Sequence, residues 1–121
     1  MRFYFERPWG KYDILYESDE CKVKIINVHP GERLSLQSHD RRQESWTIVS
    51  GTGKMVLGED EIDICSGDNI IIDKGQKHRV ESTGINNLVF IEVQTGEYFG
   101  EDDIVRYEDD YGRLSKEQDD A

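Results

Sequence analysis

Four side chains that can ligate a metal occur at spacings that fit a metal-binding site built on β-strands. They are Gln37, His39, Glu44 and His78. Successive residues of a strand point to opposite faces, so two ligands on one strand should stand at i and i+2, as Gln37 and His39 do. An amide oxygen, two imidazoles and a carboxylate suit Zn, Fe, Mn, Co or Ni better than soft Cu(I). Since a lone histidine after a turn is more often a surface residue, spacing alone leaves both interpretations open.

The run NNLVFIEVQ carries a carboxylate among large apolar side chains. Period-two alternation separates two faces, one with Val89, Ile91 and Val93, the other with Leu88, Phe90, Glu92 and Gln94. Glu92 either lines an interior cavity or lies in solvent near the mouth of a barrel. In the first case burial would raise its pKa and suit Glu92 to proton transfer near neutral pH.

Short strands must position these groups, because helical periodicity is nearly absent and β-rich runs alternate with turn residues. The runs span residues 21–28, 44–50, 54–64, 68–73, 77–82 and 86–94, and a further N-terminal strand is expected around residues 12–16. The pattern predicts an all-β sandwich or barrel, as one domain over residues 1–121, with residues 114–121 as a frayed polar tail.

Composition excludes several classes of function. The net charge of −11 disfavours binding to nucleic acid or to acidic membranes. No apolar run approaches the roughly 20 residues of a membrane span, and the first residues lack a secretory signal, so we expect a cytoplasmic protein. Cys21 and Cys65 have no zinc-knuckle spacing and are expected to be free, mostly buried thiols.

Two motifs resemble those of the cupin superfamily. The first runs from Gly31 through Gln37, His39 and Glu44 to Gly51, with Gln replacing the usual first His. The second runs over residues 67–78, with Asp in place of its usual Pro at position 73. The resemblance implies a cupin double-stranded β-helix, which is a jelly-roll barrel.

Four longer stretches of sequence resemble the C-terminal isomerase domain of type II phosphomannose isomerases. In that family this domain usually follows a mannose-1-phosphate guanylyltransferase domain in the same chain. The four stretches are RPWGKY at 7–12, VHPGERLSLQSH at 28–39, SGTG at 50–53 and IEVQTGEYFGEDDIVRYEDDYGR at 91–113. The resemblance covers nearly the whole chain. It implies a divalent metal ion, with Zn as first choice and Mn, Fe, Co or Ni as alternatives, held by Gln37, His39, Glu44 and His78.

One stretch departs from that family. Where its members commonly read QMHHHRAEHW, this chain reads QSHDRRQESW, so Asp40, Arg41 and Ser45 stand at positions that are usually His. The four metal ligands that the resemblance implies are all present in this chain. The departure bears on the groups that orient the ligands, whose loss typically costs about 10- to 100-fold in affinity or activity.

The resemblance implies the interconversion of mannose 6-phosphate and fructose 6-phosphate. Glu92 is the candidate base, with Asp102 or a metal-bound hydroxide as alternatives. Arg106 is a candidate catalytic and phosphate-binding residue, and the other candidates for substrate binding are Arg42, Lys54 and Arg113, because Arg offers planar bidentate contacts to phosphate.

Two other functions compete with the isomerase. One is a non-catalytic cupin that binds a sugar or nucleotide sugar as partner subunit of a separate guanylyltransferase, which the HDRRQES stretch favours. The other is a metal oxygenase, which is disfavoured because such sites usually carry more His ligands. Exposed strand edges make a homodimer the default expectation.

Overall fold

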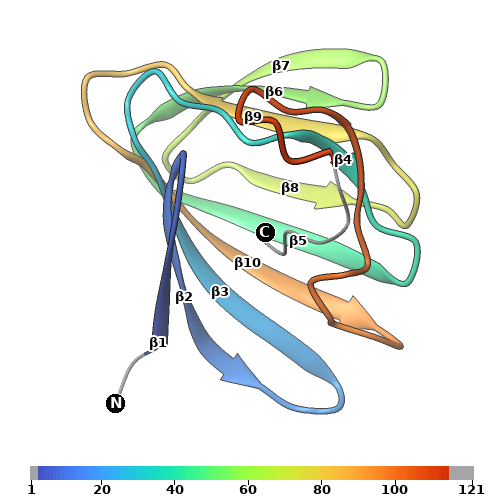
Figure 1. The fold of residues 1–121 in the computed structure, drawn as a ribbon. Helices are drawn as coiled ribbons and strands as arrows, with labels where there is room; N and C mark the ends of the chain where they lie inside the picture. The colour runs from blue at the N-terminus through green and yellow to red at the C-terminus, as the bar shows by residue number, and fades with distance from the viewer. Residues whose placement is uncertain (1–2, 115–121) are drawn as a thin grey trace.

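The chain folds into two antiparallel β-sheets that face each other (Figure 1). The computed structural model describes residues 3–114. The first sheet has the strand order β1 (Phe3–Arg7), β2 (Gly10–Glu17), β3 (Cys21–Val28), β10 (Leu88–Gly96), β5 (Arg42–Ser50) and β8 (Asn69–Ile72). The second has the order β11 (Val105–Glu108), β4 (Leu36–Ser38), β9 (His78–Ser82), β6 (Thr52–Leu57) and β7 (Asp60–Cys65).

This architecture confirms the predicted all-β cupin jelly roll. The run at 54–64 is a hairpin, with its turn after Leu57, and the expected N-terminal strand is β2. Strands β1 and β11 lie outside the expected runs, because each is short and lies among charged residues. Strand β4 lies where the spacing of Gln37 and His39 predicts a strand, but it ends at Ser38, so His39 directly follows it. Over the described part of the chain there is no helix that could cross a membrane. The expected polar tail lies, after Leu114, outside the described residues.

The apolar core lies between the sheets, on the inner faces of β5, β10 and β3. Leu88 and Phe90 are fully buried, as the alternation in β10 predicts. The ring of Phe90 stacks on Trp46 of β5 at a centroid distance of 4.1 Å. Each such aromatic side chain buries a large apolar area, so this stack fixes β5 against β10 at the centre of the sheet.

The same inner faces become polar toward one end of the sandwich. Along β5 the buried residues change from Trp46 to Glu44 and Arg42, and along β10 they change from Phe90 to Glu92 and Gln94. Because Glu92 pairs with Trp46 and Gln94 pairs with Glu44 across the two strands, their polar halves lie side by side. The sandwich therefore has an apolar half and a buried polar half.

The prediction that both thiols are mostly buried is wrong for Cys65. Cys65 is exposed at the end of β7, an edge strand, whereas Cys21 is half-buried at the start of β3. Both are free thiols. Alternation along β7 turns Ile64 inward, so the neighbouring Cys65 points to the uncovered outer face, where the apolar character of Cys does not ensure burial.

Strand β10 must end in glycine. Gly96 has φ of 144°, and a Cβ at this position would overlap the carbonyl oxygen of Arg41 and lie 3.0 Å from the Cα of Arg42. We expect Gly96→Ala to lower the free energy of unfolding by about 1–3 kcal/mol, through backbone strain and this overlap. Urea denaturation checks the value. Gly112→Ala is the control, since its φ of 74° is also positive while no atom lies within 4 Å of the added methyl group. An equal loss in both variants would exclude the overlap as a cause.

Candidate metal centre

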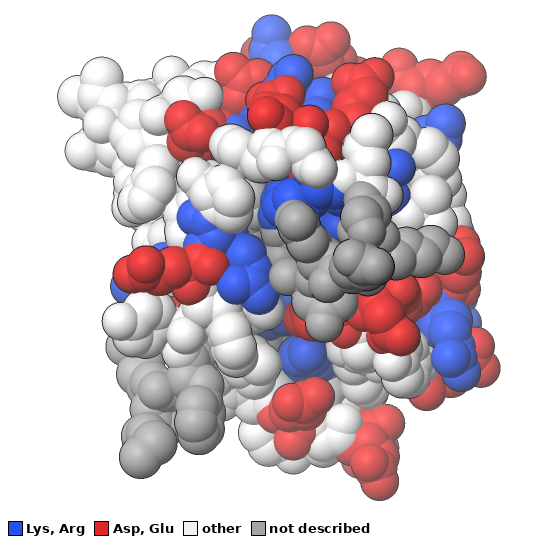
Figure 2. All heavy atoms as spheres, viewed as in Figure 1, with Lys and Arg blue, Asp and Glu red and all other residues white. Residues whose placement is uncertain are grey.

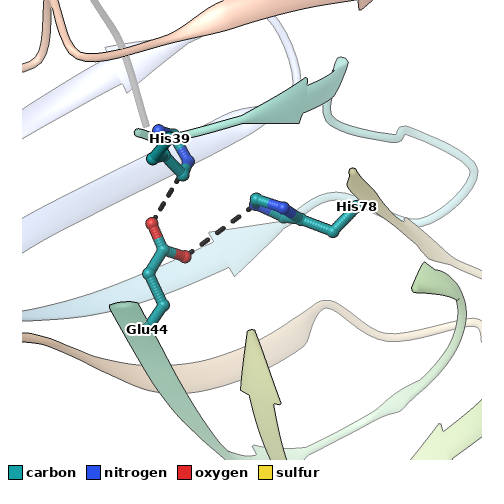
Figure 3. A group of neighbouring side chains, drawn as sticks. All are labelled: His39, Glu44 and His78. Atoms are coloured by element: carbon teal, nitrogen blue, oxygen red, sulfur yellow. Dashed lines mark ion pairs between the residues drawn. The ribbon is translucent and has the colours of Figure 1, made fainter. Parts of the chain in front are cut away.

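Three of the four predicted ligands come together at the polar end of the sandwich. His39 directly follows β4, Glu44 lies on β5 of the opposite sheet, and His78 begins β9. One ligand atom from each lies within 4.8 Å of the others, and all three side chains are buried. Figure 3 shows the Glu44 carboxylate directed at both imidazole rings, with one dashed line to each.

The two histidines direct the same ring nitrogen at the carboxylate. Nε2 of His39 is 3.2 Å from Oε2 of Glu44, and Nε2 of His78 is 3.9 Å from Oε1. Nδ1 of His39 lies 2.7 Å from the carbonyl oxygen of Asp103, and Nδ1 of His78 lies 3.0 Å from that of Gln76. A carbonyl only accepts, so Nδ1 carries the proton in each neutral ring and Nε2 presents a lone pair.

Burial keeps both rings neutral at physiological pH. Desolvation lowers the pKa of His39 to about 4, which the Glu44 carboxylate only partly opposes, and burial likewise lowers the pKa of His78. Burial alone would favour the neutral acid of Glu44, but the positive charge of Arg42 and the hydrogen bond from the Trp46 N–H act in the opposite direction, and the pKa of Glu44 lies below its usual range. The cluster thus offers two lone pairs and one anionic oxygen, a donor set that fits a divalent ion of the zinc type.

Two residues hold the Glu44 carboxylate in place. Arg42 donates from Nε to Oε2 at 3.0 Å, and Trp46 donates from its indole nitrogen to Oε1 at 2.9 Å. Arg42 also reaches Nε2 of His39 with Nη2, at 3.4 Å. The sequence analysis did not identify Trp46 as part of the site. The i, i+2 spacing of Glu44 and Trp46 on one strand is a signal that could have found it.

Gln37 lies next to His78 on the inner face of the second sheet. The two are cross-strand partners in β4 and β9, and Gln37 is buried. Its amide nitrogen donates to Oγ of Ser35 at 2.9 Å and to the Ser35 carbonyl at 3.3 Å, which fixes the plane of the amide. Gln37 is therefore in place beside the cluster, and its role as a ligand is part of the proposal below.

Glu92 lines the interior rather than facing solvent. It is 3% exposed and accepts a hydrogen bond from the amide nitrogen of Gln94 at 2.6 Å. Burial, and after it the charge of Glu44, raises the pKa of Glu92 to about 8, although Lys24 acts in the opposite direction. Lys24 is its cross-strand partner in β3. A buried carboxyl group with such a pKa can exchange protons near neutral pH.

The predicted substrate-binding residues fall at different places. Arg42 is buried inside the cluster, and Arg106 is the cross-strand partner of Gln37 in β11. Arg113 forms two hydrogen bonds with the Asp109 carboxylate, both of 2.9 Å, and its carbonyl accepts from Arg106 at 3.1 Å. Lys54 lies on the outer face of β6.

The structure does not bring Lys54 to the cluster. Its side chain is 50% exposed and pairs with Glu61 at 3.3 Å, because alternation along β6 turns the neighbouring Gly53 and Met55 inward. Asp102, the alternative base, is also exposed, and accepts a hydrogen bond from the hydroxyl of Tyr98. Neither residue enters the site proposed below.

Comparisons with known proteins agree with this architecture. Residues 2–109 match the family model described as "Mannose-6-phosphate isomerase C-terminal". The chain is 47% identical over 107 residues to the xanthan biosynthesis protein XanB of Xanthomonas campestris, with 88% of this chain and 23% of that protein covered. It is 44% identical over 108 residues to the mannose-1-phosphate guanylyltransferase of Escherichia coli K12, with 89% and 23% covered.

A solved structure supports the fold. The double-stranded β-helix protein from Klebsiella pneumoniae superposes with a TM-score of 0.67 at 25% identity, covering 72% of this chain and 76% of that one. The chain spans 23% of the length of the XanB and guanylyltransferase relatives. The chain therefore belongs to the family of mannose-6-phosphate isomerase C-terminal domains, built on the cupin double-stranded β-helix.

Proposed function

We propose that the chain is a metal-dependent aldose–ketose isomerase that interconverts mannose 6-phosphate and fructose 6-phosphate. Membership in the isomerase C-terminal family supports the reaction class. The observation that carries the proposal is the buried cluster of His39, Glu44 and His78, in which both histidines direct Nε2 at one carboxylate. No other buried group of His, Cys, Asp or Glu with ligand spacing occurs in residues 3–114.

His39, Glu44 and His78 would hold the ion, together with the oxygen of Gln37 as fourth ligand. Zn is our first choice, with Mn, Fe, Co or Ni as alternatives, since nitrogen and oxygen donors suit all of them. When bound, such an ion supplies positive charge that polarises the substrate oxygens and stabilises an enediolate. With Glu44 as the one anionic ligand of the four, much of that charge stays available to the substrate.

Glu92 is proposed as the base. In an aldose–ketose isomerisation a proton leaves the carbon next to the carbonyl and is returned to the neighbouring carbon, so one group must both accept and donate it. The raised pKa of Glu92 fits both tasks near neutral pH. Its place on β10, two residues from the cross-strand partner of Glu44, puts it on the same inner face as the metal cluster.

Arginine side chains are proposed to bind the substrate. Arg106 lies beside Gln37 on the inner face of the second sheet, and Arg42 lies within the cluster, so both can donate to a sugar phosphate. Arg113, paired with Asp109, is proposed to support Arg106 through its carbonyl oxygen. On the face shown in Figure 2, Lys and Arg side chains gather near the middle, while Asp and Glu side chains lie mostly toward the edges. A chain of net charge −11 thus presents positive charge locally, which favours an anionic substrate.

A second candidate function rests on the length of the relatives. The chain matches 23% of a protein named mannose-1-phosphate guanylyltransferase, so its role as a sugar-binding or nucleotide-sugar-binding partner of such an enzyme is the alternative. The same cluster would then hold a metal ion without turnover.

A chelator experiment separates the two functions. We expect the purified protein to contain a divalent metal and to convert mannose 6-phosphate to fructose 6-phosphate, with activity lost on chelation and regained on adding metal. The measurement is a coupled assay for fructose 6-phosphate beside elemental analysis of the same sample. Metal content without conversion would favour the binding function, and conversion that survives complete metal removal would contradict the proposed mechanism.

A further inference from the structure

The loop between β10 and β11 contacts the turn that presents His39, and it does so through Asp103. The carbonyl oxygen of Asp103 accepts from Nδ1 of His39 at 2.7 Å. The Asp103 carboxylate accepts from two successive backbone N–H groups, those of Asp40 and Arg41, at 3.0 Å each. One residue therefore binds both the ring of a proposed ligand and the backbone of the turn that follows it.

These contacts act together on the direction of the imidazole. The two N–H bonds fix the turn relative to residue 103, and the carbonyl then determines which ring nitrogen of His39 carries the proton. Nε2 is left facing Glu44 at 3.2 Å. Asp103 is itself held, since its N–H donates to the carbonyl of Gly100 at 3.1 Å and Glu101 forms ion pairs with buried lysines of β3.

This support does not involve the side chains at the three positions at which the chain departs from its family, since residues 40 and 41 contribute only backbone N–H groups. The side chains of Asp40 and Arg41 are exposed, and Ser45 pairs with Val93 on the outer face of the first sheet. The groups that contact His39 instead belong to Asp103, Arg42 and Glu44. We therefore expect changes of the side chains at residues 40, 41 and 45 to leave the orientation of the ring intact.

We infer that Asp103 is a positioning residue, which holds His39 with Nε2 toward Glu44 and thereby sets the affinity of the site for metal. The effect on affinity rests on the proposed function. The effect on the ring does not, because it concerns the metal-free chain. Two measurements separate them, namely the tautomer of His39 by ¹⁵N NMR in chelator-treated protein and the affinity for Zn²⁺ by competition with a chromophoric chelator.

The informative variant is Asp103→Ala, which removes both carboxylate contacts to the turn. We expect His39 to lose its preference for the Nδ1–H form and Zn²⁺ to bind about 10- to 100-fold more weakly. Asp40→Asn is the matched control, because it removes one negative charge next to His39 while leaving the N–H bonds to Asp103 in place; both readouts should stay unchanged. If Asp103→Ala does not fold, the nearly isosteric Asp103→Asn takes its place, with weaker changes in the same directions.

An unchanged His39 tautomer in a folded Asp103 variant would overturn the inference, whatever the Zn²⁺ affinity does. A shifted tautomer in a chain that binds no Zn²⁺ would leave Asp103 as the residue that orients His39, and would instead defeat the proposed metal-dependent function. Equal effects of Asp40→Asn and Asp103→Ala would also overturn it, since charge rather than the hydrogen bonds would then be responsible.

Discussion

Glu92→Gln should lower kcat by about 10²- to 10⁴-fold while metal content stays unchanged, because an amide cannot take up the proton that a carboxylate accepts. The replacement is nearly isosteric, and its oxygen can still accept from Gln94 as Glu92 does. The measurement is steady-state turnover of mannose 6-phosphate beside elemental analysis. Glu97→Gln, an exposed carboxylate on the loop that follows β10, is the control and should retain full activity.

The raised pKa of Glu92 gives this prediction a second, independent readout. In the metal-free protein burial raises the pKa to about 8 from an ordinary value of 4.5. Between these two values the folded state keeps a proton that the unfolded chain has lost, so the stability contributed by this group falls as pH rises through the window. Urea denaturation should therefore show Glu92→Gln gaining stability relative to the unaltered protein from about pH 5 to about pH 8. Near-normal turnover of the variant would remove Glu92 from the mechanism, and a stability difference independent of pH would contradict its burial as a neutral acid.

Glu44→Gln should reduce both stability and metal binding. Both oxygens of Glu44 accept hydrogen bonds, one from Arg42 and one from Trp46, so the NH₂ group of a glutamine would have to face one of these donors. The Arg42 guanidinium, 1% exposed, would also lose its carboxylate partner. Leaving a buried charge without its partner typically costs about 3–5 kcal/mol, and the site would lose its one anionic ligand.

Two measurements check this second prediction. Urea denaturation of the metal-free proteins gives the stability, and competition with a chelator gives the metal affinity, which we expect to fall by orders of magnitude. Glu61→Gln is the matched control, because it makes the same chemical change in an exposed pair with Lys54 and should alter stability by less than about 0.5 kcal/mol. Stability and affinity like those of the unaltered protein in Glu44→Gln would show that the carboxylate is not part of the site.

Alternation along strands predicted the parts of the site that lie on strands. Period two correctly grouped Glu92 with Leu88 and Phe90 on one face of β10, and burial of that face decides between the two positions left open for Glu92. The i, i+2 spacing of Gln37 and His39 also predicted a strand there, although β4 ends one residue before His39. Alternation does not decide which end of a strand is covered. Lys22 and Lys24 share the inner face of β3 with Ile26, and they are buried because Glu101, far along the chain, pairs with both.

The orienting contacts could not be predicted from the sequence. Asp103 reaches His39 from a loop 64 residues away, and loop geometry has no period from which a contact can be derived. The exposure of Lys54 has a different cause. Lys54 is a candidate for substrate binding in sequence, but its side chain points outward because the inward positions of β6 belong to Gly53 and Met55. Motifs therefore give the residue types of the site, whereas their support depends on tertiary packing.

The most direct test of the metal centre is anomalous diffraction at the absorption edge of the bound ion, from crystals of the purified protein. We predict one strong peak per chain, between Nε2 of His39, Nε2 of His78 and the Glu44 carboxylate, within coordination distance of the Gln37 amide oxygen. A peak at any other place, or no peak at this cluster in crystals saturated with Zn²⁺, would contradict the proposal that these side chains share one cation.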